Sequence, residues 1–117
     1  MKEKVTAGII EKDGKVLIAK RKTGKCIGAK WEFPGGKLED NETLEECLKR
    51  ELKEELNIDV EIGAFFDSST FSCGERTIQL KAYKVIYLSG ELMLNDHEQI
   101  KWIEPKELIN YEFTLPD

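Results

Sequence analysis

The segment 43–56 restricts the fold more than any other part of the sequence, because its pattern predicts a single strong helix. Thr43-Leu44-Glu45-Glu46 matches a capping box, in which a threonine and a glutamate three residues later satisfy backbone groups at a helix N-terminus. The residues that follow, up to Leu56, are almost all good helix formers. Any fold for this chain therefore has to pack one face of this helix against other elements.

Short apolar runs on both sides of the helix predict β-strands. These runs lie at residues 5–11, 16–21, 31–33, 60–66, 77–88 and 100–103. Asp13-Gly14 suits a tight hairpin turn after the first run. Gly63, Gly74 and Ser89-Gly90 are expected to separate the later strands, and residues 105–109 allow at most a short helix. Strands before and after one helix indicate one mixed α/β domain of the α+β type over residues 1–117.

Apolar and acidic side chains share one side of the predicted helix. At about 100° per residue, Leu48 and Leu52 lie near 60° and 100° from Glu51 and mark the face expected to be buried. Glu54 and Glu55 fall near 300° and 40° on the same wheel, at about 100° per residue. All three carboxylates are therefore expected within or beside the buried face, where an unpaired charge is costly. A bound cation would relieve their repulsion, and an ordinary acidic surface helix is the alternative.

The available ligands indicate which cation would suit these carboxylates. Carboxylate oxygens favour a hard ion, so Mg²⁺ or Mn²⁺ is the expected cofactor. Cys26, Cys47 and Cys73 are widely spaced, contain no CxxC pair and have no histidine cluster beside them, which disfavours a zinc site. Their odd number also disfavours a disulfide framework and is typical of a reducing cytoplasm.

The charges are divided between two neighbouring segments. Residues 20–37 contain six basic residues and one acidic residue, whereas residues 39–61 contain ten acidic and three basic residues. This division suits a site in which cations and basic side chains together hold an anion, although solvated surface charge is an alternative. The net charge of −5 argues against nucleic acid as the partner. The N-terminal apolar run is too short for a signal peptide or a membrane span.

A spaced motif connects a glycine turn to the helix. Five residues separate Gly36 from Glu42, and seven more separate Glu42 from residues 50–58, Arg-Glu-Leu-Lys-Glu-Glu-Leu-Asn-Ile. This pattern resembles the Nudix box, Gly-x5-Glu-x7-Arg-Glu-U-x-Glu-Glu-x-Gly-U, where U is aliphatic. Asn57 replaces the second glycine of the box, and asparagine is the substitute best able to adopt the left-handed conformation that closes a helix.

The likeness extends beyond the box. Residues 30–37, Lys-Trp-Glu-Phe-Pro-Gly-Gly-Lys, and residues 19–21, Ala-Lys-Arg, are similar to the MutT branch of the family, so the resemblance covers most of the chain. It implies an α/β/α sandwich with a mixed central sheet and one long catalytic helix, in which the C-terminal helix is short or missing here. It also implies Mg²⁺-dependent hydrolysis of a nucleoside triphosphate to monophosphate and pyrophosphate, by attack at the β-phosphorus.

The resemblance assigns roles to residues of the box. Glu51, Glu54 and Glu55 would ligate the metal, together with a backbone carbonyl of the Gly35-Gly36 turn. Arg50 and Glu42 would orient the loop and the helix around that site.

Other roles fall outside the box. Arg21 and Lys37 match positions near the phosphates, and Phe33 and Asp117 are the remaining candidates for substrate contact. A further acidic residue is expected six positions before Trp102, at Asp96, with Glu98 as its alternative. His97 is more typical of a loop residue than of a catalytic base.

The implied substrate is a nucleoside triphosphate with an oxidised purine or a cytidine-type base, which the enzyme would remove from the nucleotide pool. An ADP-ribose hydrolase is a competing interpretation, but that branch tends to carry a proline soon after the box, and none occurs between Pro34 and Pro105. A non-catalytic nucleotide sensor is another, although such domains commonly lose box glutamates and none is lost here. The sequence leaves the oligomeric state open between monomer and homodimer.

Overall fold

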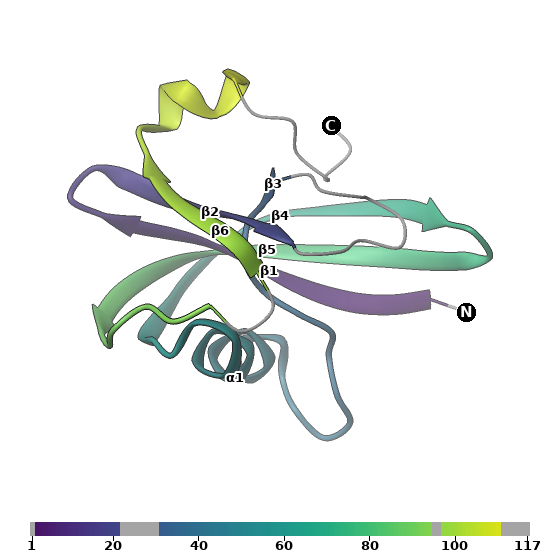
Figure 1. Cartoon of the computed structure of the whole chain (residues 1–117). Coiled ribbons are helices and arrows are strands. Elements are labelled where there is room, and N and C mark those ends of the chain that lie inside the picture. Colours follow the sequence, from purple (N-terminus) through teal and green to yellow (C-terminus); the bar gives the residue numbers. More distant parts are fainter. Residues whose placement is uncertain (1, 22–30, 95–96, 111–117) are drawn as a thin grey trace.

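The computed structural model describes residues 2–21, 31–94 and 97–110 (Figure 1). The elements in chain order are β1 (Lys2–Lys12), β2 (Lys15–Arg21), β3 (Trp31–Glu32), α1 (Leu44–Leu56), β4 (Asp59–Cys73), β5 (Arg76–Ser89), β6 (His97–Ile103) and the 3-10 helix η1 (Pro105–Asn110). Figure 1 shows α1 on one side of the sheet and η1 on the other. Within these ranges no helix is long and apolar enough to cross a membrane. The predicted mixed α+β class is confirmed, with η1 as a short final helix.

Helix α1 begins and ends where the sequence predicts. At its start the Glu46 amide donates to Thr43 Oγ1 at 3.1 Å, and the Thr43 amide donates to Glu46 Oε1 at 2.8 Å. At its end Asn57 adopts the left-handed conformation, with φ 61° and ψ 35°, and its amide donates to the Lys53 carbonyl. Both end signals are confirmed, so the length of α1 is set by local chemistry.

The sheet is mixed because its two central strands run parallel. Strand β1 pairs with β5 from Lys2↔Thr77 to Glu11↔Ile86, although β2, β3, α1 and β4 lie between them in the sequence. The other strand pairs are antiparallel, and the main strand order is β3-β2-β1-β5-β4, with β6 on the second edge of β2. The predicted mixed sheet is therefore confirmed, in an order that periodicity alone does not supply.

Strands β1 and β2 diverge, and residues 31–38 fill the space between them. The two strands are paired only near their hairpin, after which β3 pairs with β2 instead. The chain then crosses to β1, where the amides of Gly8 and Thr6 donate to the carbonyls of Pro34 and Gly36, each at 2.7 Å. This crossing places the glycine turn beside the middle of the sheet.

Strand β4 is longer than its apolar run predicts, and the expected break at Gly63 is wrong. The strand continues to Cys73, and Gly63 lies inside it at a shift in the register with β5 between Ile62 and Phe65. A Cβ on Gly63 would lie 3.0 Å from the Lys84 carbonyl oxygen, which explains a glycine there. The polar residues beyond Phe66 remain a strand because β5 supplies their backbone partners.

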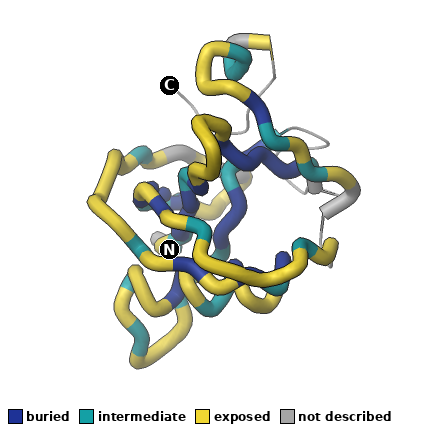
Figure 2. The backbone as a smooth tube through the Cα atoms, turned by 90° about the vertical axis from the view of Figure 1, so that its left-hand side faces the viewer, coloured by how far each residue is buried: buried dark blue, intermediate teal, exposed yellow. Residues whose placement is uncertain are grey.

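The main core lies between α1 and the sheet. Leu48, Leu52 and Leu56 on α1 are completely buried, and they pack with Ile10 of β1 and Val85 of β5. Figure 2 shows buried stretches in the interior of the molecule and exposed residues on its outer turns. Burying each of these large apolar side chains contributes roughly 1.5–3 kcal/mol, which holds α1 in a fixed place against the sheet.

Candidate active site

The surroundings of the Gly35-Gly36 turn leave little room for a side chain at either residue. A Cβ on Gly35 would lie 2.0 Å from the Thr6 carbonyl oxygen, inside the backbone of β1. A Cβ on Gly36 would lie 2.1 Å from the carboxyl carbon of Glu51. The turn is therefore pressed between β1 and the acidic side of α1, and the backbone at Gly36 touches the Glu51 carboxylate.

The carbonyls of this turn point in two directions. Those of Pro34 and Gly36 accept hydrogen bonds from β1. Successive carbonyls of an extended segment alternate in direction, so the Gly35 carbonyl between them points away from β1. Of the two carbonyls that the sequence leaves as candidate ligands, that of Gly35 is thus the one whose direction is not set by a bond to β1.

The three box glutamates of α1, Glu51, Glu54 and Glu55, differ in burial, which corrects one expectation. The Glu51 side chain is 15% exposed and Glu55 is 6% exposed, but the Glu54 side chain is 61% exposed. Glu54 lies at the edge of the arc that the sheet covers, so the helical wheel overestimated its burial. Burial also raises the pKa of the Glu51 carboxyl above its ordinary value, against the opposing effect of Arg50.

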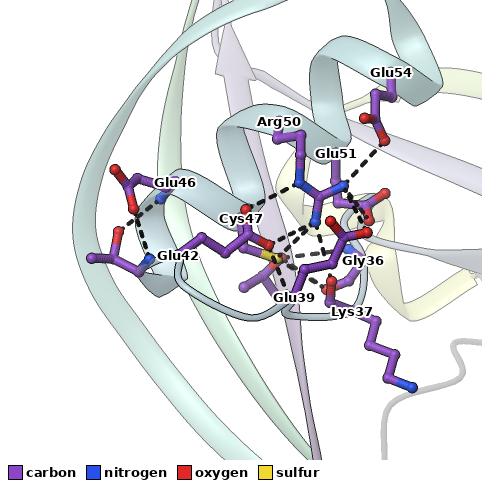
Figure 3. Close-up of polar contacts among 11 residues, drawn as sticks. Gly36, Lys37, Glu39, Glu42, Glu46, Cys47, Arg50, Glu51 and Glu54 are labelled. Atoms are coloured by element: carbon purple, nitrogen blue, oxygen red, sulfur yellow. Dashed lines mark hydrogen bonds and ion pairs between the residues drawn. The ribbon is translucent and has the colours of Figure 1, made fainter.

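Arg50 links the loop before the helix to the carboxylates of the helix (Figure 3). Its Nε and Nη2 donate to Glu42 at 3.1 and 2.7 Å, and Nη2 also donates to the Lys37 carbonyl at 3.3 Å. Its Nη1 donates to Glu51 Oε2 and Glu54 Oε1, both at 3.1 Å. Hydrogen bonds from Arg50 lower the pKa of Glu42 to about 2. One guanidinium thus fixes the loop and holds two box glutamates together.

This arrangement is compatible with a hard divalent cation. Among the described residues, no three His, Cys, Asp or Glu side chains are arranged to hold an ion. Arg50 Nη1 places positive charge between Glu51 and Glu54, so the two carboxylates lie on either side of one cationic group. Carboxylate oxygens and a backbone carbonyl are the ligands that Mg²⁺ and Mn²⁺ prefer, so the donor set fits such an ion.

An open cleft lies beside these groups. Its volume is about 580 Å³, and it is lined by Lys37, Leu38, Glu39, Asp40 and Glu51. That volume lies within the usual range of small-molecule sites, roughly 300–1,000 Å³. The site therefore has room for a ligand next to the Glu51 carboxylate.

The other predicted site residues are spread more widely. The Lys37 ammonium lies 3.5 Å from Glu3 Oε1 and its side chain is 67% exposed, so it faces β1 in this structure. Phe33 is partly buried and packs on two small core clusters that include Ala7 and Val16. For these two residues substrate contact stays a prediction.

Several predicted residues are located only in part. Arg21 ends β2 and pairs in register with His97 of β6, whose neighbour is Glu98, but the structure does not describe these side chains. Asp96 and Asp117 lie outside the described residues. Their predicted roles therefore remain predictions.

Two residues that bond to the turn were not predicted as part of the site. Thr6 is 1% exposed and its side chain contacts Gly36, and the buried thiol of Cys47 lies beside both. Burial raises the pKa of the Cys47 thiol above its ordinary value. The sequence signal for Thr6 is a polar residue on the same side of the strand as Gly8 and Ile10. Cys47 was predicted only to lie on the buried face of the helix.

Comparison with known proteins agrees with the spaced motif. The NUDIX domain family matches residues 2–116. The chain is 37% identical over 113 residues to a CTP pyrophosphohydrolase of Escherichia coli (strain K12), a match that covers 97% of this chain and 84% of that protein. It is 44% identical over 89 residues to an 8-oxo-dGTP diphosphatase of Proteus vulgaris, which covers 75% of this chain and 80% of that protein.

A solved structure extends the agreement to the fold. The solution structure of the E. coli ORF135 protein superposes with a TM-score of 0.85 at 37% identity, covering 96% of this chain and 80% of that one. The predicted resemblance is confirmed by sequence and by structure. Since the family match spans nearly the whole chain, this protein belongs to the NUDIX domain family.

Proposed function

We propose that this protein is a pyrophosphohydrolase that converts a nucleoside triphosphate to the monophosphate and pyrophosphate, with Mg²⁺ or Mn²⁺ as cofactor. The observation that carries the proposal is the contact of the Gly35-Gly36 turn with Glu51, on the helix that also bears Glu54 and Glu55. Arg50 donates hydrogen bonds to Glu51 and Glu54. The names of the two relatives, a CTP pyrophosphohydrolase and an 8-oxo-dGTP diphosphatase, support the same class of substrate.

The proposed metal ligands are Glu51, Glu54, Glu55 and the Gly35 carbonyl, with the Gly36 carbonyl as the alternative. When bound, a divalent ion supplies charge neutralisation at the phosphate oxygens and a more acidic water. Arg50 keeps two hydrogen bonds to Glu42 through Nε and Nη2, so the loop stays anchored when the Glu51 and Glu54 carboxylates turn from Nη1 toward an ion. The protein's own part is thus to hold oxygen ligands in place before the substrate arrives.

The proposed reaction is attack of water at the β-phosphorus. The water oxygen forms a bond to that phosphorus, and the bond to the oxygen that bridges the α- and β-phosphorus atoms breaks. The bridging oxygen leaves with the monophosphate, and the attacking oxygen stays in pyrophosphate. Asp96 or Glu98 would supply the further acidic group near the attacking water, and Arg21 and Lys37 would balance the charge of the phosphates.

The base is proposed to be an oxidised purine or a cytidine-type base, with Phe33 and Asp117 as candidate contacts. The two relatives differ on this point by name, one acting on CTP and the other on 8-oxo-dGTP. Removal of such nucleotides from the pool is therefore the biological role that we propose.

A panel of nucleotides tests the proposed function. The purified protein is incubated with Mg²⁺ and CTP, dCTP, 8-oxo-dGTP, dGTP or ADP-ribose, and the products are separated by chromatography. Release of a monophosphate and pyrophosphate from a triphosphate is expected, with ADP-ribose a poor substrate. Glu51→Gln is the control, because it keeps the shape of the side chain but removes the charge. Activity that persists in EDTA, or equal activity of Glu51→Gln, would refute the proposal.

A further inference from the structure

Thr6 is a polar residue in a position where the strand otherwise presents small or apolar groups to the helix. It is 1% exposed, and Gly8 and Ile10 on the same side of β1 lie against the leucines of α1. A hydroxyl buried in such surroundings is unfavourable unless it is hydrogen-bonded. The hydrogen-bond partners of the Thr6 hydroxyl therefore indicate its role.

Those partners are on the glycine turn. The Thr6 amide donates to the Gly36 carbonyl at 2.7 Å, and Thr6 Oγ1 donates to the same oxygen at 3.1 Å. The Gly36 amide in turn donates to Thr6 Oγ1 at 3.4 Å. One residue thus binds both polar backbone groups of Gly36, and its hydroxyl contacts each of them.

Cys47 connects this pair to the helix. Its Sγ lies 3.6 Å from Thr6 Oγ1 and 3.6 Å from the Gly36 carbonyl oxygen. Arg50 Nη2 donates to the same sulfur at 3.9 Å. Because Cys47 lies one helical turn before Glu51, the contact ties the turn to the side of α1 that bears the box glutamates.

The contact of Thr6 and Cys47 with Gly36 affects the close spacing between the glycine turn and Glu51. Gly36 is so close to the Glu51 carboxylate that a Cβ would overlap it, and Gly35 precedes Gly36 directly. A movement of the turn would therefore change the distance between the carbonyl ligand and the carboxylates. Mg²⁺ requires near-ideal octahedral geometry at about 2.0–2.1 Å, so its binding is sensitive to such a movement.

We propose that Thr6 is a positioning residue, which holds the Gly35-Gly36 turn at the distance from Glu51 that metal binding requires, with Cys47 as its link to α1. This inference rests on the proposed function, because it assumes that the turn and the glutamates bind a divalent ion. Thr6 itself does not touch the metal or the substrate.

The test measures metal affinity without substrate. Mn²⁺ is titrated into wild type, Thr6→Val and Thr6→Ser, and free Mn²⁺ is followed by electron paramagnetic resonance. Thr6→Val keeps the shape but removes the hydroxyl, and it is expected to weaken Mn²⁺ binding by about 2- to 12-fold, the scale of one hydrogen bond. Thr6→Ser restores the hydroxyl and is expected to bind Mn²⁺ within about twofold of wild type.

Ile10→Val is the control for a purely structural effect. It removes a methyl group from the same side of β1, away from the turn, and should lower the thermal unfolding midpoint while leaving the Mn²⁺ Kd unchanged. If Thr6→Val behaves in the same way, with a lower midpoint and an unchanged Mn²⁺ Kd, the positioning role is refuted. If Thr6→Val does not fold, Thr6→Ala, which also removes the hydroxyl, replaces it, and an unchanged Kd in that variant refutes the role equally.

The outcome is separable from that of the proposed function. A wild-type protein that binds Mn²⁺ but hydrolyses none of the nucleotides would refute the function, while weaker Mn²⁺ binding by Thr6→Val would still support the positioning role. A wild-type protein that hydrolyses triphosphates, with equal Mn²⁺ affinity in Thr6→Val, would support the function and refute the positioning role.

Discussion

The junction between the glycine turn and α1 differs from the β4–β5 hairpin in how its residues are held. At the junction, backbone and side chains from distant segments restrain one another: Gly36 bonds to Thr6, and Arg50 bonds to Glu42 and to two box glutamates. In the hairpin, the strands are joined mainly by backbone pairing, the register shifts near Gly63, and large apolar side chains face outward.

The exposure of the hairpin side chains makes the contrast clear. Phe65 and Phe66 are 52% and 56% exposed, and Ile86 and Leu88 are 51% and 59% exposed. By comparison, Thr6 and Cys47 are almost completely buried. A substitution at the junction should therefore change chemistry, whereas one in the hairpin should change little that an assay of turnover detects.

The largest effect is expected from the box glutamates. Glu54→Gln and Glu55→Gln should each lower kcat/KM about 100-fold or more, since metal-supplied charge stabilisation amounts to several kcal/mol and about 1.4 kcal/mol is tenfold. Both variants should stay folded, because the amide is close in shape to the carboxyl. Steady-state kinetics and circular dichroism check the two parts, and turnover within about threefold of wild type in both would end the ligand assignment.

A smaller effect is expected at the end of β2. Arg21→Ala should lower kcat/KM. The corresponding loss of transition-state stabilisation should be about 1–3 kcal/mol, the scale of a charge-assisted hydrogen bond. Lys15→Ala, at the exposed start of the same strand, removes an equal charge and is the matched control. Equal kinetics of the two variants would show that general charge, rather than phosphate contact, explains the basic segment.

Acid unfolding should depend on two carboxylates of similarly lowered pKa, Glu42 and Glu3. Arg50 lowers the pKa of Glu42 from 4.5 to about 2, and Arg76 does the same for Glu3. A lowered folded-state pKa stabilises the protein above the unfolded-state value, and this stability is lost as the pH falls from about 4.5 through 2. Glu42→Gln and Glu3→Gln should each make the free energy of unfolding less dependent on pH in that window.

Only one of these two substitutions should affect turnover. Glu42 bonds to the arginine that holds Glu51 and Glu54, whereas Glu3 bonds to Arg76 at the edge of the β4–β5 hairpin. Urea titrations at a series of pH values, together with kinetics at neutral pH, check both parts. A loss of kcat/KM in Glu3→Gln as large as in Glu42→Gln would contradict the distinction between the two regions.

The smallest effect is expected in the hairpin itself. Leu88→Ser replaces an exposed leucine and should change the free energy of unfolding by no more than about 0.5 kcal/mol, with kcat/KM unchanged. Chemical denaturation and kinetics measure both. A large decrease in the free energy of unfolding would contradict the exposure of Leu88 in the structure.

Much of the fold was predictable because its signals are local. The capping box at Thr43 and the asparagine at position 57 define α1, and alternating apolar runs locate the strands. The parallel pairing of β1 with β5 was not predictable, since it joins segments far apart in the sequence. The extension of β4 past Phe66 was missed for a related reason, because its polar residues depend on backbone pairing with β5.

The part of the site that belongs to the spaced motif was predictable. The box located Glu42, Arg50 and the α1 glutamates, and the structure shows Arg50 bonded to Glu42, Glu51 and Glu54. The exposure of Glu54 was not predictable, because a wheel contains no information on where the sheet ends. Thr6 was missed because its role depends on the crossing of residues 31–38 to β1, a long-range contact that its polarity on the buried side of the strand does not reveal.

Hydrolysis in ¹⁸O-labelled water tests the proposed reaction most directly. The protein is incubated with Mg²⁺ and its preferred nucleoside triphosphate, and the products are analysed by mass spectrometry. Attack at the β-phosphorus predicts that the label appears in pyrophosphate and that the monophosphate is unlabelled. Label in the monophosphate alone would mean attack at the α-phosphorus and would contradict the proposed reaction.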